Sequence, residues 1–434
     1  MFGFFLPKNS VSFYSLKHHI QFFNFMFSIA VTKQNHSLDF LSTKFKRLLL
    51  LACLILLASA CTQQEEISFE NIEAPSNSAK AFGYEATFSY PSFSGEFEVA
   101  STSTLVTDLS RMNPFIENSV DNRELQIRFY YPTVNSTSKN DSKKLSVISP
   151  DAWDYMIGHQ EMSGKKLRYE NYRKATWYIT LDQPVSTALP SYPVLIFSHG
   201  YGYNAESYSA MSAELASRGY MVVSINHTYG ANPSYLSDDK PVWAKSLPKN
   251  DLSAYLSVWS DDQIFIIDQL NLINNNPDSL LFQKLDLANL GVFGHSYGGA
   301  AAYHTAAADP RIKAVIDIDG TIFNFEQAFI TQPFAFILSK DHQPKFDYQH
   351  SEGKSYELRF KDFEHISFTD HILWWQWDHD ELDLGLGNIN GYRAIELTTE
   401  IVDDFFGHFL LSKESQWFQT NNVKTKEVSL TRKN

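Results

Sequence analysis

The sequence has little cysteine, no excess of basic side chains and no apolar run of membrane-spanning length. Two cysteines in 434 residues exclude a disulfide framework and a cysteine-based zinc site. The 36 Lys and Arg are outnumbered by 49 Asp and Glu, and the formal net charge of −13 disfavours nucleic acid, whose phosphates bind clustered basic residues. The apolar stretch Leu48–Leu57 is shorter than the about 20 residues that a transmembrane helix needs.

The remaining composition is that of a globular protein. Hydrophobic residues make up 44% and charged residues 20%, so a sizeable core is available and global disorder is excluded. The length suits one large α/β domain with extensions, or two ordinary domains. An aromatic content of 15% permits a wide apolar pocket without requiring one.

Residues 1–60 are typical of an export signal. A basic segment ending at Arg47 precedes the apolar run Leu48–Leu57, and the small residues of Ala58–Cys61 follow it, as in a secretory signal. The tetrad Ala-Ser-Ala-Cys resembles a bacterial lipobox, in which the cysteine becomes lipidated. We therefore expect Cys61 to carry a lipid, and the protein to be exported and anchored to a bacterial membrane, at the outer membrane or cell surface.

The composition of three further segments indicates what each of them is. The Phe-rich residues before Lys44 are unusual for a signal, which suggests a start codon assigned too far upstream. Residues 61–80 are polar and predict a flexible tether. Residues 81–434 predict a single α/β domain with an irregular, partly helical insertion around 133–190.

Apolar runs of strand length alternate with helical segments after residue 190. Fully apolar strands between helices predict a parallel sheet covered on both faces. Earlier, Glu124–Tyr131 alternates and predicts a strand that ends at Pro132. The other expected strands are Val194–Phe197, Met221–Ile225, Leu290–Phe293, Ala314–Ile318, Phe334–Leu338 and Tyr356–Phe360, and the expected helices are Ala205–Arg218, Asp261–Leu270, Gly298–Ala308 and Ala394–Leu411.

Gly294–Gly298 has the sequence Gly-His-Ser-Tyr-Gly, a G-x-S-x-G pattern between an expected strand and an expected helix. In that context the pattern predicts a nucleophile elbow, a tight turn that exposes the hydroxyl of Ser296. The first turn of the next helix points backbone N–H groups toward developing negative charge. The alternative, an idle serine in a glycine-rich turn, is disfavoured by the strand and helix. The elbow predicts an α/β-hydrolase fold, with a mostly parallel central sheet and helices on both faces.

A serine hydroxyl needs a base within hydrogen-bond reach, and the chain order in this fold is serine, acid, histidine. His365 follows the last expected strand, Tyr356–Phe360, where a loop would return the imidazole to Ser296. His371 and His379 are alternatives at less favourable positions. The other histidines after the serine are His304, His342, His350 and His408, and the first and last of these lie on expected helices.

The acid has two candidates at strand ends. Asp319 ends the strand Ala314–Ile318, and Asp341 follows the next strand, Phe334–Leu338. Both ends face the active-site edge of such a sheet. The general α/β-hydrolase pattern often favours Asp341, and Asp317 lies deeper in its strand, so the residues alone leave the choice open.

Six motifs are spread over roughly Leu125–Leu411: Phe129–Pro132, Ser198–Gly202, Leu215–Tyr220, Asp262–Leu270, Gly294–Ala300 and His365–Asp370. Together they resemble the plasma-type platelet-activating factor acetylhydrolases and their bacterial relatives. The resemblance implies that the acid is Asp319, with Asp341 as the alternative, and that the base is His365. It also implies an oxyanion hole formed by the backbone N–H groups of Tyr201 and Tyr297.

Other polar clusters carry weaker signals. His199 and His295 lie in different loops without a carboxylate pair of suitable spacing, so we expect structural roles and no metal. The acidic run Asp378–Asp383 is most simply a solvated loop. Trp374, Trp375 and Trp377 would either wall an acyl pocket or pack beneath the loop.

These observations predict a serine carboxylic-ester hydrolase that works through an acyl-enzyme and needs no cofactor. The resemblance implies short-acyl or phospholipid-type esters as substrates, and a lipid ester and a membrane as partners. Polysaccharide acyl or aromatic esters are an alternative. A different class, a surface lipoprotein that uses a hydrolase fold for binding alone, is disfavoured because candidates for serine, acid and histidine are all present.

Overall fold

The computed structural model describes residues 89–134, 151, 177, 179–249, 251–378, 385–419 and 422–434. The chain divides into two units, Met1–Glu73 and Ala74–Asn434, and every described residue belongs to the second. The expected signal segment, the lipidation site Cys61, the tether and most of the insertion around 133–190 lie outside the described residues.

Strands and helices alternate along most of the described chain. The strands are β1 (Glu98–Met112), β2 (Asn122–Thr133), β3 (Thr180–Leu181), β4 (Tyr192–Ser198), β5 (Met221–Asn226), β6 (Ser234–Tyr235), β7 (Pro241–Val242), β8 (Leu285–His295), β9 (Ala314–Ile318), β10 (Phe334–Leu338), β11 (Ser355–Phe360), β12 (Asn422–Lys424) and β13 (Val428–Arg432). The α-helices are α6 (Ser209–Ser217), α7 (Leu256–Asn275), α8 (Tyr297–Ala308), α9 (His371–Asp378) and α10 (Gly391–Leu411), and the 3₁₀ turns are η1 (Ala205–Tyr208), η2 (Phe325–Gln327), η3 (Tyr348–His350) and η4 (His365–Phe368).

Eleven of the described strands form one sheet, in the order β12-β13-β11-β10-β9-β8-β4-β5-β2-β1-β3. The block from β11 to β5 is parallel throughout. Antiparallel pairs flank it, with β13 and β12 on one side and β2 and β1 on the other. The predicted mostly parallel sheet is therefore confirmed, and the antiparallel flanks add to it.

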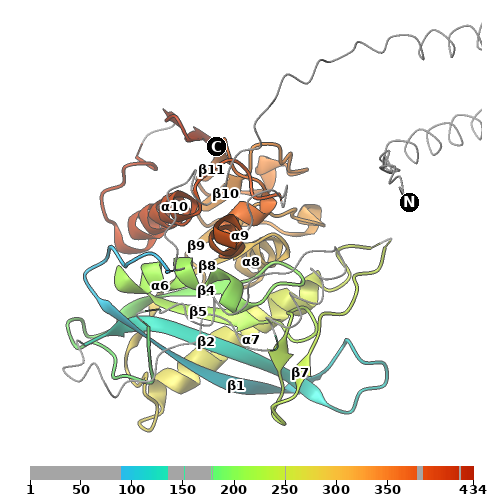
Figure 1. Ribbon diagram of the computed structural model, residues 1–434. Helices are drawn as coiled ribbons and strands as arrows, with labels where there is room; N and C mark the ends of the chain where they lie inside the picture. Colours follow the sequence, from blue (N-terminus) through green and yellow to red (C-terminus); the bar gives the residue numbers. More distant parts are fainter. Residues whose placement is uncertain are drawn as a thin grey trace, which may run out of the picture. The chain divides into compact units, whose positions relative to one another are not determined.

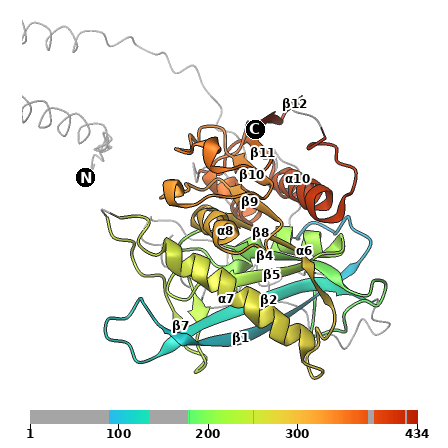
Figure 2. The same cartoon turned by 180° about the vertical axis from the view of Figure 1, so that it is seen from behind.

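Helices cover both faces of the sheet, because successive strand residues point to opposite sides. In β4, Leu195 and Phe197 join the core beneath α6 and α10, while Val194 and Ile196 join the core beneath α7 and α8. Figure 1 shows α6, α9 and α10 on the near face, and Figure 2, from behind, shows α7 and α8 on the other. All four β4 side chains are fully buried, which explains the continuous apolar run in the sequence.

Several of the expected boundaries are wrong. The strand β8 begins five residues before the expected Leu290, and α7 extends five residues beyond each end of the expected helix Asp261–Leu270. The strand expected to end at Pro132 continues to Thr133, which pairs with β1 and forms an isolated bridge with Val185; pairing with β5 stops at Tyr130, so Pro132 need not donate to that strand. The helix expected over Ala205–Arg218 is a 3₁₀ turn, η1, followed by the shorter α6.

None of the helices within the described ranges has the length and hydropathy required to cross a membrane.

Candidate active site

Ser296 occupies a sharp turn between the end of β8 and the start of α8. Its backbone lies at φ 56° and ψ −119°, a strained conformation for a residue with a side chain. A Cβ at Gly294 would lie 2.3 Å from the carbonyl carbon of Gly298, and a Cβ at Gly298 would lie 2.3 Å from the carbonyl oxygen of Ser198. The backbone is therefore too crowded for larger residues at either glycine, as the elbow pattern predicts.

The structure brings Ser296, His365 and Asp319 into one hydrogen-bonded set, which we call the open triad. The Oγ of Ser296 lies 3.0 Å from Nε2 of His365, and Nδ1 of His365 lies 2.7 Å from Oδ2 of Asp319. The His365 side chain is 44% exposed, whereas that of Asp319 is 1% exposed. The ionised carboxylate of Asp319 accepts a hydrogen bond from Nδ1–H of His365. Nε2 of His365 therefore carries no proton and can take the proton of Ser296.

Asp319 is held in its ionised form. Burial alone would raise its pKa, but the hydrogen bond and charge of His365 and the amide of Ser339, 2.7 Å from Oδ1, outweigh burial and hold the pKa below its usual value. His342 adds to the effect, with Nδ1 3.6 Å from Oδ1. The carboxylate is thus prepared to stabilise a positive charge on His365.

The alternative residues lie elsewhere. The Asp341 side chain is 82% exposed, with one oxygen 3.9 Å from Nζ of Lys340. His371 is buried against Trp374 and Trp375, with Nε2 3.3 Å from Oγ of Ser207. His379 and most of the acidic run Asp378–Asp383 fall outside the described residues.

Two backbone amides beside Ser296 are available to an oxyanion. A Cβ on Gly200 would lie 3.3 Å from Cβ of Ser296, so the turn after β4 meets the elbow directly. The amides of Gly200 and Gly202 donate to the Tyr208 hydroxyl and the Gly230 carbonyl. Across the described chain, the intervening amide of Tyr201 and that of Tyr297 have no protein acceptor. Both are therefore suited to binding a developing negative charge.

The two histidines considered as metal ligands are engaged in hydrogen bonds within the fold. Within the described ranges, no group of three His, Cys, Asp or Glu side chains is placed to hold a metal ion. Nδ1 of His199 lies 2.7 Å from the Gly200 carbonyl oxygen, and Nδ1 of His295 lies 2.7 Å from the Tyr208 hydroxyl. Burial lowers the pKa of His199 to about 3, and burial with the charge of His365 lowers that of His295.

A second serine–histidine–aspartate set, which we call the buried triad, lies behind the oxyanion turn. Nε2 of His227 lies 2.8 Å from Oγ of Ser198, and Nδ1 lies 2.9 Å from Oδ2 of Asp262. Arg123 makes two contacts with Asp262, at 3.1 and 2.6 Å, and all four side chains are buried. Gln263 donates to Oγ of Ser198 at 2.6 Å, which turns the serine proton toward His227.

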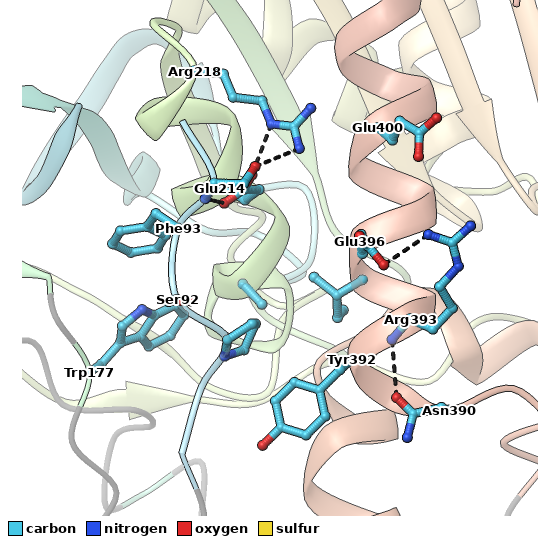
Figure 3. A pocket seen from close by; sticks show the side chains of 14 residues that line it. Ser92, Phe93, Trp177, Glu214, Arg218, Asn390, Tyr392, Arg393, Glu396 and Glu400 are labelled. Atoms are coloured by element: carbon cyan, nitrogen blue, oxygen red, sulfur yellow. Dashed lines mark hydrogen bonds and ion pairs between the residues drawn. The ribbon is translucent and has the colours of Figure 1, made fainter. Parts of the chain in front are cut away.

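A separate cavity of about 540 Å³ lies between α6, α10 and residues 91–94, and none of its 14 lining residues belongs to the open triad. Figure 3 shows Arg218 beside Glu214 on one wall and Arg393 beside Glu396 on another, at 2.9 and 2.8 Å. Both arginines of the cavity are thus paired with carboxylates along the walls. Trp374 lies in the core, where its Nε1 donates to the Tyr90 hydroxyl at 3.0 Å, so this tryptophan packs rather than lining an acyl pocket.

Three further side chains lie near the open triad. Tyr208 contacts the oxyanion turn, His342 faces Asp319, and Asp317 lies beneath the elbow with one oxygen accepting from Gly320 at 2.8 Å. Within the described ranges the other Asp317 oxygen has no hydrogen-bond partner, and burial raises the pKa of this carboxyl far above its usual value. Sequence reasoning considered His342 and Asp317 as candidates but missed Tyr208, because its bond to His295 spans 87 positions and no local motif indicates it.

The sequence matches a family model described as Platelet-activating factor acetylhydrolase, isoform II, over residues 83–269 and 267–358. The curated relatives include Platelet-activating factor acetylhydrolase of Cavia porcellus, 27% identical over 259 residues that cover 52% of this chain and 57% of that protein. Probable 1-alkyl-2-acetylglycerophosphocholine esterase of Arthroderma benhamiae is 27% identical over 136 residues, which cover 30% of this chain and 32% of that protein. The alignment with the first relative thus spans little more than half its length.

Among solved structures, a ferulic acid esterase from Streptomyces cinnamoneus is similar, with a TM-score of 0.65. The match covers 77% of this chain and 96% of the esterase, at 21% sequence identity. At that identity the likeness supports the α/β-hydrolase fold and not a shared substrate.

Proposed function

The chain belongs to the family of platelet-activating factor acetylhydrolases, isoform II, and on that premise we propose that it hydrolyses carboxylic esters through an acyl-enzyme on Ser296. The observation that carries the proposal is the open triad, in which one imidazole bridges a serine hydroxyl and a buried carboxylate at 3.0 and 2.7 Å. Two unpaired amides beside that hydroxyl complete the requirements for acyl transfer.

The reaction runs in two halves. Oγ of Ser296 attacks the ester carbonyl carbon while Nε2 of His365 takes its proton, and the Tyr201 and Tyr297 amides bind the oxyanion. The C–O bond to the alcohol then breaks, and His365 returns the proton to the leaving oxygen. Water, deprotonated by His365, attacks the acyl carbon and releases the acid and the free serine. Asp319 keeps the imidazole in its tautomer and stabilises the imidazolium.

The first test is Ser296→Ala, measured with para-nitrophenyl acetate and with a fluorophosphonate probe. We expect kcat/KM to fall by about 10⁵-fold or more and labelling to disappear, because neither base nor acid can replace the nucleophile. Retained turnover in the folded variant would reject the proposal. Absence of labelling in the wild-type protein would instead favour the alternative, a non-catalytic binding protein with a hydrolase fold.

We propose short-acyl or phospholipid-type esters as the substrate class. The support is the family, together with the name of the fungal relative, which specifies an acetyl ester of a glycerophosphocholine. The test compares kcat/KM for nitrophenyl esters of rising chain length, a short-acyl phosphatidylcholine and methyl ferulate. A preference for the ferulate or for acetylated polysaccharide would replace this proposal with the alternative.

We also propose that the protein is exported and held to a membrane by a lipid on Cys61. The support is the sequence of residues 44–61, in which basic, apolar and small residues precede the cysteine. Metabolic labelling with a fatty-acid probe should mark the wild type and not Cys61→Ser, and the variant should be released from membranes. Equal labelling of both would contradict lipidation at this residue.

A further inference from the structure

Tyr208 and His295 form a buried bridge between the parts of the proposed active site. The Tyr208 hydroxyl lies 2.7 Å from Nδ1 of His295 and accepts the Gly200 amide at 3.1 Å. Nε2 of His295 lies 3.0 Å from the backbone carbonyl oxygen of His365. The side chains of the bridge are at most 1% exposed, so water does not compete for these bonds.

One arrangement of protons satisfies every bond in the bridge. The Gly200 amide can donate and not accept, so the Tyr208 oxygen accepts there and gives its own proton to Nδ1 of His295. Nδ1 is therefore unprotonated, and the ring carries its proton on Nε2, which faces the acceptor oxygen of His365. A neutral His295 also suits its place beside His365, whose ring centroid is 4.5 Å away and which becomes positively charged during acyl transfer.

Each end of the bridge makes a hydrogen bond to the backbone beside or at a residue of the proposed active site. Gly200 immediately precedes Tyr201, whose amide is a proposed oxyanion donor. The carbonyl that His295 binds belongs to His365, the proposed base, and His295 itself precedes Ser296. Three segments that are distant along the chain thus meet through two side chains.

We propose that Tyr208 and His295 are positioning residues that fix the oxyanion donor and the base relative to Ser296. The inference rests on the proposed function and assigns neither residue direct contact with substrate. Displacement of reacting groups by about 1 Å can cost on the order of a hundredfold in rate, so loosening the bridge should slow the reaction without weakening substrate binding.

The test variant is Tyr208→Phe, which removes one hydroxyl and keeps the ring. Its matched control is Tyr130→Phe, because Tyr130 is also fully buried and its hydroxyl bonds to Ser209 at 2.7 Å, beside Tyr208 in the chain. With para-nitrophenyl acetate we expect kcat of Tyr208→Phe to fall by about 10- to 100-fold, with KM within about twofold. The control should keep both constants within about twofold while losing similar thermal stability.

Two substitutions at His295 separate its two bonds. In His295→Asn the amide oxygen stands near the place of Nδ1 and keeps an acceptor for Tyr208. In His295→Gln the amide nitrogen stands near the place of Nε2 and keeps a donor to His365. Because Tyr208→Phe and His295→Gln break the same bond, their losses in kcat should be clearly less than additive when combined.

The outcomes separate this inference from the proposed function. If Ser296→Ala is inactive while Tyr208→Phe matches the Tyr130→Phe control, the positioning role is overturned and the esterase proposal stands. Full additivity of Tyr208→Phe and His295→Gln would likewise overturn the bridge. If Tyr208→Phe does not fold, His295→Gln takes its place, and an unchanged kcat there has the same meaning. An active Ser296→Ala would instead remove the proposed function.

Discussion

The open triad and the buried triad each link a serine hydroxyl through an imidazole to a carboxylate, with contacts of similar length. Their distances are 3.0 and 2.7 Å in one and 2.8 and 2.9 Å in the other. They differ in access, because the imidazole of the open triad is 44% exposed and that of the buried triad is fully buried. Geometry alone therefore does not make a serine reactive.

Their surroundings differ as much as their exposure. Ser198 accepts a hydrogen bond from Gln263, whereas Ser296 lies beside two unpaired amides suited to an oxyanion. Asp262 also pairs with Arg123 and Arg111, and the charges of these two arginines oppose protonation of His227. Burial also lowers the pKa of His227, which opposes a protonated intermediate. We therefore expect the open triad to be the reactive one and the buried triad to be a structural network.

The largest effect is expected at the acid of the open triad. Asp319→Asn should lower kcat by about 10⁴-fold, because an amide favours the wrong tautomer of His365 and cannot stabilise the imidazolium. Asp341→Asn is the matched control, an exposed carboxyl on the next loop, and should leave kcat within about twofold. A loss in the control equal to that in Asp319→Asn would transfer the role to Asp341.

The equivalent change in the buried triad should affect folding rather than catalysis. Asp262→Asn leaves Arg123 without its buried partner, and such an unpaired charge costs about 3–5 kcal/mol of unfolding free energy. Chemical denaturation measures the loss, and titration of active sites with the fluorophosphonate corrects kcat for unfolded protein. A fall in corrected kcat comparable to that of Asp319→Asn would show that the two triads are not separate in function.

Asp370 sharpens the contrast, because it is a buried carboxyl that has no cationic partner in the described part of the chain. Burial raises its pKa to about 7, despite hydrogen bonds from the Ala210 amide and Tyr90. As pH rises through 4 to 7 the unfolded chain loses this proton before the folded chain does, so this group makes folding less favourable across that window. Asp262, with its pKa lowered, has the opposite sign and loses its contribution as pH falls.

Asp370→Asn should therefore match the wild type in stability near pH 4 and gain on it above pH 7, by about 4 kcal/mol, because each unit of a pKa difference between the folded and unfolded chains is worth about 1.4 kcal/mol. The amide keeps an acceptor for the Ala210 N–H, so the start of α6 remains bonded. Denaturation curves at four pH values from 4 to 8 provide the measurement. A stability difference from the wild type that is the same at every pH would show that Asp370 has the same pKa in the folded and unfolded chains.

The smallest effect is expected at the buried serine. Ser198→Ala leaves Gln263 and His227 each short of one hydrogen bond, which should cost about 1–3 kcal/mol of unfolding free energy. The corrected kcat should stay within about tenfold, and labelling by the fluorophosphonate should be unchanged. Abolished labelling would mean that Ser198, rather than Ser296, carries the reactive hydroxyl.

Much of the fold follows from local patterns in the sequence. The strands Ala314–Ile318 and Phe334–Leu338 have the expected bounds, because a fully buried parallel strand is a short, continuous apolar run. The strand β1 has no continuous apolar run in its sequence. Its Ser- and Thr-rich sequence is half exposed, and its pairing with β2 holds it in place. The helix α9 and the strands β12 and β13 were likewise not expected.

The site residues that can be predicted from the sequence are those indicated by a short motif or by a position next to a strand. Ser296 follows from a motif of five residues, and His365 from its place after the last parallel strand. Both Asp319 and Asp341 end strands at the active-site edge, and the general α/β-hydrolase pattern often favours Asp341. The family resemblance favours Asp319, which is the one that contacts His365. Tyr208 was not found, because its bond to His295 spans 87 positions and no pattern in either segment indicates the other.

The three members of the open triad follow β8, β9 and β11, strands that are laid down in chain order and that lie in that order across the sheet. The nucleophile is therefore synthesised before its base, and the base lies beyond β11, which pairs with β10 on one side and with β13 on the other. Ester turnover by a refolding chain should thus be a late signal, appearing after most of the secondary structure has formed.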